Sequence, residues 1–518
     1  MINVLRGGTR AQAGVLPLLA AILILLATTS EARAQAETGF QTTAPPMLAP
    51  AAADVTVDPI ITVGETIPGG YFFESIPDGI SLRGRSGGRV NAYVNHETAR
   101  VPFPPTESDF TNAIVSRLTL NETTAGVVSA EYVIPSDANF VRFCSNFIAR
   151  REHGFERPLL FTNEESSDLV NRRGEVWPPG PDARQAGVVV AYDLRRKRYR
   201  AIYGMGRHNH ENAVALRGYG HPVVLSGDDT FSPPSSQLYM YTARNGNAVW
   251  NDRGQLWAFK SNNPRINDYG DIAHAASVSG RFIRVPRAVA LGDQTSLETW
   301  SNDHGVFQFI RVEDIAYDRR KSNVVYFADT GEPRALPGPG TAQMTRGPSG
   351  TMGPFPNGRL FKLVLDRRDP RKVRSLSILI DGDVIGSAGA GNTALIHQPD
   401  NIETTKRSLL IQEDPGSHNQ YAPDNAAGTT ARIWRYDFET GALTVVARVD
   451  QSTEPTANQG SWESSGIVDA SKFFGAGGFL VDVQAHTLIL ERLDDPARPG
   501  ISLKREGGQL LLLRIPGA

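Results

Sequence analysis

A degenerate pattern recurs six times along this chain and restricts the folds that it can adopt. Each copy opens with a short apolar strand that carries an acidic residue, or once a cysteine, near its start. A second β-rich run follows and ends in further acids. Because one repeated unit must bury its apolar surface against its neighbours, the copies predict a single repeated architecture. The copies begin at Pro77, Cys144, His210, Arg311, Pro399 and Glu463.

Most copies continue with a third strand of alternating or aromatic residues, such as residues 188–193 and 433–436. A turn and a fourth strand close some units, most clearly at residues 439–446. Long helical periodicity is absent, so short strands bounded by turn residues are the main signal. Repeated four-stranded antiparallel units predict an all-β fold, a six-bladed β-propeller with loop insertions at residues 264–303 and 336–357. Two packed β-sandwiches are the alternative fold.

The N-terminus is typical of an export signal. Arg6 and Arg10 precede an apolar run at residues 15–28, and small residues follow. This order predicts a secretory signal peptide cleaved after Ala34 or Ala36. An uncleaved membrane anchor is the alternative, although the apolar run is shorter than the roughly 20 residues of a spanning helix.

The chain therefore divides into three predicted segments. Residues 1–36 are the signal peptide and export segment, residues 37–65 a flexible lead-in, and residues 66–518 the propeller domain. After signal cleavage we expect no stable membrane insertion and a periplasmic or extracellular protein.

Charge and cysteine content exclude several classes of partner. The 53 Lys and Arg residues nearly balance the 55 Asp and Glu residues, which gives a net charge of −2. No global basic field attracts nucleic acid, so we expect no nucleic-acid partner. A single cysteine, Cys144, excludes zinc fingers and disulfide scaffolds. We expect a monomer.

In a propeller the first strand of each blade lines the central channel, so residues at equivalent positions form a ring. The opening acids of five copies would lie on one ring, and the cysteine would take their place in the second copy. Acids at the ends of the second strands would form a neighbouring ring. The first ring comprises Asp78, Cys144, Glu211, Glu313, Asp400 and Glu463, and the second comprises Glu97, Glu164, Glu165, Asp228, Asp229, Asp329, Glu413 and Asp414.

So many converging carboxylates repel one another unless cations compensate them. Oxygen donors select Ca²⁺ or Mg²⁺, and a thiolate among carboxylates also suits a transition metal such as iron. His208 and His210 lack the paired helical spacing of a zinc protease, so we interpret them as supporting donors. The one G-x-S-x-G match, at residues 84–88, precedes no helical pattern and reads as a turn.

This set of motifs resembles the PhoX family of secreted bacterial alkaline phosphatases. The resemblance runs from Pro77 to His486 and rests on short motifs in order. It implies a six-bladed propeller whose funnel holds iron and calcium ions. The motifs are Asn95-His96-Glu97, Cys144, Asn163-Glu164-Glu165, His210-Glu211, Gly227-Asp228-Asp229, Arg311-Val312-Glu313 and Pro399-Asp400-Asn401.

The resemblance also implies roles for individual residues. Iron ligands would be Cys144, Glu164, Glu211 and Glu313, and calcium ligands would be Asp228, Asp229, Asp400 and neighbouring acids such as Glu165. Arg311 would contact the substrate phosphate as the catalytic and substrate-binding residue.

The expected function is metal-dependent hydrolysis of phosphomonoesters at a carboxylate-rich funnel. The cofactors would be calcium and iron, and the partner would be a small-molecule phosphoester. Two alternatives stay open from the sequence. One is a non-catalytic, calcium-stabilised binding propeller, and the other is a phytase-like or lactonase-like propeller hydrolase.

Overall fold

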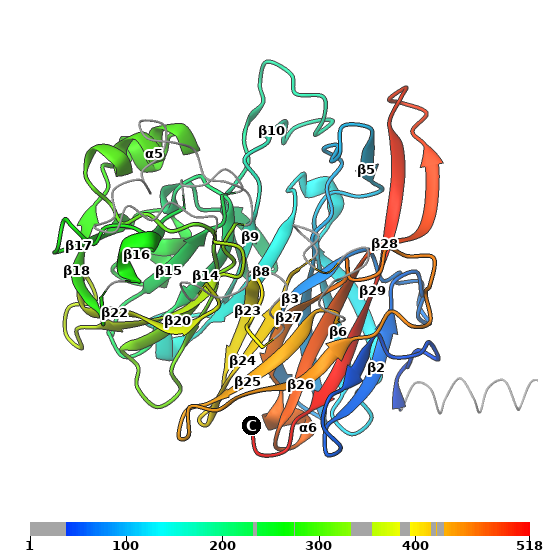
Figure 1. Cartoon of the computed structure of the whole chain (residues 1–518). Helices are drawn as coiled ribbons and strands as arrows, with labels where there is room; N and C mark the ends of the chain where they lie inside the picture. Colours follow the sequence, from blue (N-terminus) through cyan, green and yellow to red (C-terminus); the bar gives the residue numbers. More distant parts are fainter. Residues whose placement is uncertain are drawn as a thin grey trace, which may run out of the picture.

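Antiparallel β-sheets make up most of the protein, with only short helices between them (Figure 1). The computed structural model describes residues 38–230, 236–273, 275–332, 355–383, 394–415, 421 and 429–518. The chain is therefore all-β, as predicted. Within these residues, every helix is too short or too polar to traverse a bilayer. The predicted signal peptide lies outside the described residues.

The first two repeats each form a four-stranded antiparallel sheet. In both, the strand that opens the repeat lies at one edge and the strands then follow in chain order. The first sheet comprises β3 (Pro77–Arg85), β4 (Arg89–His96), β6 (Ile114–Asn121) and β7 (Val127–Ile134), and the second comprises β8 (Phe143–Ala149), β9 (Leu159–Glu164), β12 (Val189–Asp193) and β13 (Arg198–Ala201).

The third and fourth repeats join into one nine-stranded sheet, because β18 pairs with β22. The opening strands β14 and β19 lie at its two edges. Its strands, in spatial order, are β14 (His210–Ala215), β15 (Val223–Asp228), β16 (Leu238–Thr242), β17 (Gln255–Ser261), β18 (Val278–Arg284), β22 (Lys372–Asp381), β21 (Arg359–Leu365), β20 (Val324–Asp329) and β19 (Val312–Tyr317).

The last two repeats recruit strands from the N-terminal part of the chain. The fifth sheet comprises β23 (Pro399–Thr404), β24 (Ser408–Glu413), β25 (Arg432–Asp437), β26 (Leu443–Val449) and β1 (Leu48–Pro50), and the sixth comprises β27 (Glu463–Asp469), β28 (Gly478–Asp494), β29 (Ser502–Arg514) and β2 (Thr56–Thr62), with β5 (Glu107–Asp109) also paired to β29.

The remaining elements are short. The predicted insertion at residues 264–303 supplies β18 and three helices, whereas the one at 336–357 lies largely outside the described residues. These elements are the strand pair β10 (Leu169–Val170) and β11 (Arg184–Gln185), the helices α2 (Gly246–Trp250), α3 (Tyr269–Ile272), α4 (Arg287–Ala290), α5 (Gln294–Asp303) and α6 (Ser471–Phe474), and the 3₁₀ turns η1 (Ser136–Ala138), η2 (Arg151–His153) and η3 (Tyr203–Met205).

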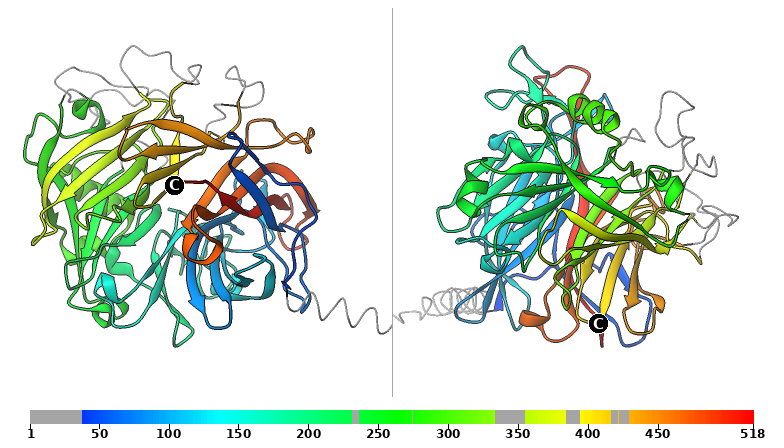
Figure 2. Two further views of the ribbon diagram at one scale, coloured as in Figure 1. Left: turned by 90° about the horizontal axis from the view of Figure 1, so that it is seen from below. Right: turned by 90° about the vertical axis from the view of Figure 1, so that its left-hand side faces the viewer.

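The opening strands of the six repeats contact one another in a closed cycle, β3–β8–β14–β19–β23–β27–β3. Seen from below, the sheets follow one another around the molecule in chain order (Figure 2, left). A separate apolar cluster lies between each consecutive pair of repeats. One example packs Tyr93 and Val115 of the first sheet against Ile148 and Val190 of the second. The hydrophobic effect thus holds each sheet against both of its neighbours.

The predicted flexible lead-in at residues 37–65 is wrong for the part that the structure describes. β1 pairs with β26, and β2 pairs with β29. Ile60 and Ile61 are fully buried in the apolar cluster between the sixth and first repeats. The Ala- and Pro-rich composition hid these strands, because their stability comes from pairing with the distant C-terminal part of the chain.

This pairing predicts that Ile61→Ala destabilises the protein strongly. Truncating a fully buried isoleucine leaves a cavity and should lower the free energy of unfolding by about 2–5 kcal/mol. Urea denaturation measures the change. Thr56→Ala, at an exposed position of the same strand, is the control and should alter stability little. Equal stability of Ile61→Ala and the control would show that β2 is dispensable.

Candidate metal centre

The acidic residues gather where the opening strands begin. In the first five repeats the opening strand pairs its first residue with the last residue of the next strand: Pro77 lies opposite His96, and His210 lies opposite Asp228. In the sixth, Glu463 lies opposite Gln484 within β28. The opening strands also contact one another in the cycle described above. Carboxylates at the starts of these strands and just after the ends of their partners are therefore brought to one region.

In five of the six repeats, counted over the described chain, the register between the opening strand and its neighbour shifts directly after the first paired residue. A β-bulge of this kind releases side chains from strict alternation and can turn them toward a site. The bulge residues include Asp78, Cys144, Glu211, Glu313 and Asp400. In the sixth repeat the shift falls later, between Ser465 and Ile467. The acids and the cysteine thus occupy a shared local conformation.

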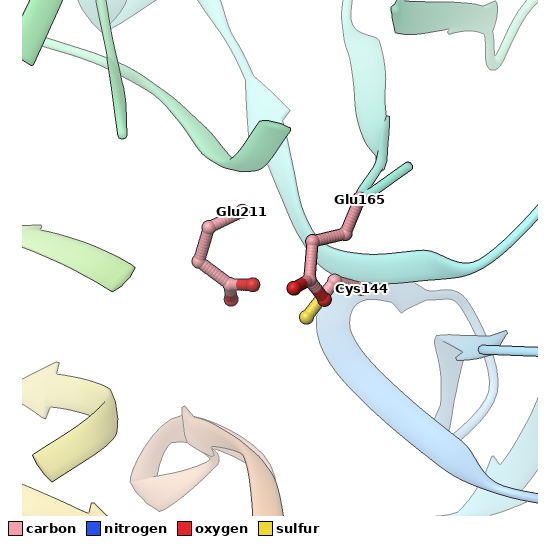
Figure 3. Close-up of side chains that lie close together, drawn as sticks. All are labelled: Cys144, Glu165 and Glu211. Atoms are coloured by element: carbon pink, nitrogen blue, oxygen red, sulfur yellow. The ribbon is translucent and has the colours of Figure 1, made fainter. Parts of the chain in front are cut away.

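Three overlapping groups of side chains place their donor atoms within 4.8 Å of one another. Glu211 belongs to the first and second groups, and Asp400 to the second and third, so the three groups form one chain of donors. Figure 3 shows the first group, in which the Cys144 sulfur lies beside the Glu165 carboxylate with Glu211 facing them. The groups are Cys144–Glu165–Glu211, Glu211–Glu313–Asp400 and Asp400–Asp414–Glu463.

Burial and mutual repulsion oppose the charging of these groups. Burial, together with neighbouring carboxylates such as Asp229, raises the pKa of Glu165 well above its ordinary value. The same two causes raise the pKa values of Glu211, Asp400 and Glu463. With protein groups alone, the centre therefore favours protonated carboxyls.

Cys144 supplies the sulfur donor of the first group. Burial and the nearby charges of Asp78, Glu211 and Glu165 raise the pKa of its thiol. The thiol in turn lowers the pKa of the neighbouring Asp78 and Glu211 carboxyls, although burial outweighs its effect. A cation at this point would reverse the preference and favour the thiolate, because coordination stabilises the deprotonated form.

Arg311 places one positive charge among the carboxylates. Its Nε and Nη2 donate to the two carboxylate oxygens of Asp229 at 2.7 and 2.6 Å, a bidentate pair. Nη2 also lies 3.1 Å from Oε1 of Glu313. Arg311 and Glu313 therefore lie side by side, and the guanidinium meets protein carboxylates here.

The donor set fits cations. Among the described residues, Oδ2 of Asp78 and Oδ1 of Asp400 are buried without a hydrogen-bond partner. An unpartnered buried oxygen is costly unless a cation or another donor satisfies it. Carboxylate oxygens suit Ca²⁺, and the thiol of the first group adds a donor suited to iron.

Three of the predicted ligands, Glu164, Asp228 and Asp229, lie outside the three groups. Glu164 accepts from the Val141 backbone N–H at 3.0 Å and pairs with Arg172 at 2.6 Å. Successive side chains of a strand point to opposite sides, so Glu165 reaches the centre where Glu164 does not.

Asp228 and Asp229 also point to opposite sides. Asp228 accepts from the Thr230 hydroxyl at 2.8 Å, whereas the next residue, Asp229, contacts Arg311 and Glu165. Asp329 and Glu413 also turn away from the centre and bind backbone N–H groups, among them those of Ile310 and His397. In these pairs, the strand-terminal acid supports a loop.

Asp414 and Glu463 were not predicted as ligands, although the repeat placed both among the ring acids. The structure brings them together with Asp400. Its position in the sequence could have identified Asp414 as a ligand, because it directly follows a strand-terminal acid, as Glu165 and Asp229 do. His486 also lies at this end, with Nε2 3.9 Å from Glu463.

Residues 182–469 match the family described as Alkaline phosphatase PhoX. This chain belongs to the PhoX family. The matched range contains the donor-group residues from Glu211 to Glu463, but Cys144 and Glu165 precede it. Membership in this family indicates a phosphatase, a hydrolase of phosphate esters. No curated protein matches the sequence.

Several solved structures are similar at low identity. A protein of unknown function from Dyadobacter fermentans is 8% identical with a TM-score of 0.43, over 88% of this chain and 99% of that one. The GH93 α-L-arabinofuranosidase of Fusarium graminearum is 9% identical with a TM-score of 0.36, over 88% and 97%. The NanB sialidase of Streptococcus pneumoniae is 9% identical with a TM-score of 0.31, over 86% and 68%.

The raised pKa values predict how pH affects the chelated protein. Burial raises the pKa of Glu97 and Asp329 to about 7, and several donor-group carboxyls are raised further. The folded chain then binds more protons than the unfolded chain between pH 6.5 and 8, so stability falls as pH rises. The melting temperature in chelator should drop by several degrees across this window.

Adding Ca²⁺ at pH 8 should restore the lost stability, because a ligand of the folded state alone adds about 2.7 kcal/mol at a hundredfold excess over Kd. Histidines with lowered pKa values, such as His210 at about 4, act in the opposite direction near pH 6.5, because the unfolded chain still binds protons there. Their contribution fades above about pH 7.5, so the fall between pH 7.5 and 8 reports chiefly the carboxyls. A chelated protein whose melting temperature is constant or rises from pH 6.5 to 8 would refute this electrostatic interpretation.

Proposed function

We propose that this chain is a metal-dependent phosphatase that hydrolyses phosphomonoesters to an alcohol and inorganic phosphate. The observation that carries the proposal is the continuous chain of donors from Cys144 to Glu463 in a member of the PhoX family. Phosphoryl transfer depends chiefly on positioning and charge neutralisation. A centre rich in metal donors, with an arginine beside them, meets both needs.

The donor residues would hold more than one cation. Calcium fits the two all-carboxylate groups, which share Asp400. Iron fits the group of Cys144, Glu165 and Glu211, because a thiolate is a softer donor. Bound cations would attract the phosphate oxygens and stabilise the charge that builds up during ester cleavage. Glu164 and Asp228 would support the loops around this set.

Arg311 would bind the phosphate through two parallel hydrogen bonds. Its guanidinium is fixed by Asp229 and lies beside Glu313. A planar fork of donors matches two phosphate oxygens, which a lysine ammonium cannot do. Asp229 is therefore the positioning residue for Arg311.

A six-bladed propeller accounts best for the arrangement of the sheets. The closed cycle of six opening strands and the apolar cluster between each consecutive pair of repeats support it. The nine-stranded sheet would then be two blades joined through β18, and β2 would close the sixth blade beside β29.

We also propose that the protein is exported and acts as a periplasmic or extracellular monomer on small phosphoesters. The basic N-terminus, the apolar run and the Ala34 and Ala36 cleavage motif support export. Calcium loading outside the cytoplasm is compatible with this location.

The direct test is hydrolysis of p-nitrophenyl phosphate by the purified protein. Activity should be lost in chelator, return with added metal, and fall at least a hundredfold in Glu211→Gln, since Glu211 is shared by two donor groups. Glu439→Gln, at an exposed turn, is the matched control and should keep full activity. Calcium binding without hydrolysis would favour a binding propeller, and hydrolysis of phytate or lactones alone would favour the other hydrolases.

Arg311 supplies a second test of the site. Arg311→Lys should raise KM for p-nitrophenyl phosphate by about tenfold or more, because the bidentate contact is lost while the charge remains. Arg311→Ala should lower turnover further and leave metal content unchanged. If metal is lost in Arg311→Ala, the residue maintains the acid cluster and does not bind substrate.

A further inference from the structure

The opposite end of the opening strands forms a second site. The acids lie at the starts of these strands, and the strand ends line a cavity of about 740 Å³. All six opening strands contribute to its wall, together with η2 and α6. The cycle of opening strands therefore carries the donor groups at one end and this cavity at the other.

A layer of polar side chains separates the cavity from the donor groups. The Ser145 hydroxyl donates to Glu211 at 2.8 Å, and the Asn401 amide donates to Ser145 at 3.1 Å. Asn212 donates to Asp314, whose other oxygen accepts from the Ile402 backbone N–H at 2.9 Å. These groups are buried and hydrogen-bonded across neighbouring strands, so the two sites are distinct.

Positive charge predominates in the cavity wall, with seven Arg and Lys side chains against five Asp and Glu side chains. Several of the acids are already engaged. Glu403 pairs with Arg319 at 2.7 Å, and Glu156 accepts from the backbone N–H groups of Gly246 and Asn247. These carboxylates leave other cations in the wall uncompensated.

Two of the seven cations form a salt bridge, Arg157 with Asp193 and Arg319 with Glu403. Within the described part of the chain, no carboxylate forms a salt bridge with the other five, which are Arg83, Arg150, Arg151, Arg195 and Lys472. The same positive charge acts on the neighbouring His153. Burial and the charges of Arg150, Arg319 and Arg217 lower the pKa of its imidazole to about 3.

Aromatic and aliphatic side chains complete the wall. Phe147 packs against His153 at a ring separation of 5.2 Å, and His153 lies 5.8 Å from Tyr317. Phe473 lies beside Lys472, whose ammonium is 5.6 Å from the ring centre. A small ligand in this cavity would meet flat apolar surface and cations together.

We propose that this cavity binds a small organic anion that has an aromatic body. Arg83, Arg150 and Lys472 would hold the anionic group, and Phe147, Tyr317 and Phe473 would contact the ring. The volume lies within the roughly 300–1,000 Å³ range of small-molecule pockets. The site is independent of the proposed phosphatase centre.

Isothermal titration of the full chain with 2-naphthalenesulfonate tests the site, because a sulfonate is not a phosphatase substrate. Arg83→Gln/Arg150→Gln should weaken binding by about tenfold or more, since a hydrogen bond to a charged group contributes roughly 1.5–3 kcal/mol. Lys472→Gln changes an exposed residue of α6 and should also weaken binding. Its affinity tests the site even if the double variant does not fold. Arg200→Gln, exposed on β13, is the matched control.

The proposal expects wild type and Arg200→Gln to bind equally and the neutral 2-naphthalenesulfonamide to bind more weakly. All variants should hydrolyse p-nitrophenyl phosphate at the wild-type rate, which separates this cavity from the donor groups. The proposal would be overturned if wild type did not bind the sulfonate. It would also be overturned if the double variant and Lys472→Gln both bound it with the affinity of wild type. Equal affinity for the sulfonamide would show that the cations do not select an anion.

Discussion

Repulsion between buried carboxylates is the interaction that the rest of this structure must accommodate. Two unit charges 4 Å apart repel by about 4 kcal/mol at an effective dielectric constant of about 20. The donor groups hold several such pairs, because donor atoms within each group lie within 4.8 Å of one another. Native proteins are stable by only about 5–15 kcal/mol. A fully charged centre therefore requires compensation, and Arg311 supplies one charge.

The closed cycle of strands explains how such a centre can exist at all. Five of the six repeats contribute one or two residues to the donor groups, and six apolar clusters between the repeats oppose the repulsion among them. The pairing of β2 with β29 joins the two ends of the described chain. The hydrophobic interior and the polar layer of Ser145, Asn212 and Asn401 then keep the acidic end apart from the cationic cavity.

The repeat and the inner acids were predictable because they depend on short, local patterns. Glu211, Glu313 and Asp400 open strands at equivalent points, and the structure places all three in one group. The choice between Glu164 and Glu165, or between Asp228 and Asp229, was not predictable from the pattern. It depends on which of two successive side chains faces inward, and a shift of one residue reverses the answer. The pairings of β1 and β2 depend on partners almost 400 residues or more away, and no local signal reports them.

Metal content is the most direct measurement of this account. Elemental analysis of the purified, dialysed protein should find more than one tightly bound cation per chain, with calcium and a transition metal both present. The transition metal should be lost in Cys144→Ser while calcium is kept, because only the first donor group contains the thiol among the described residues. A wild-type protein that is folded at pH 8 and holds no metal would contradict the central claim that cations compensate the buried carboxylates.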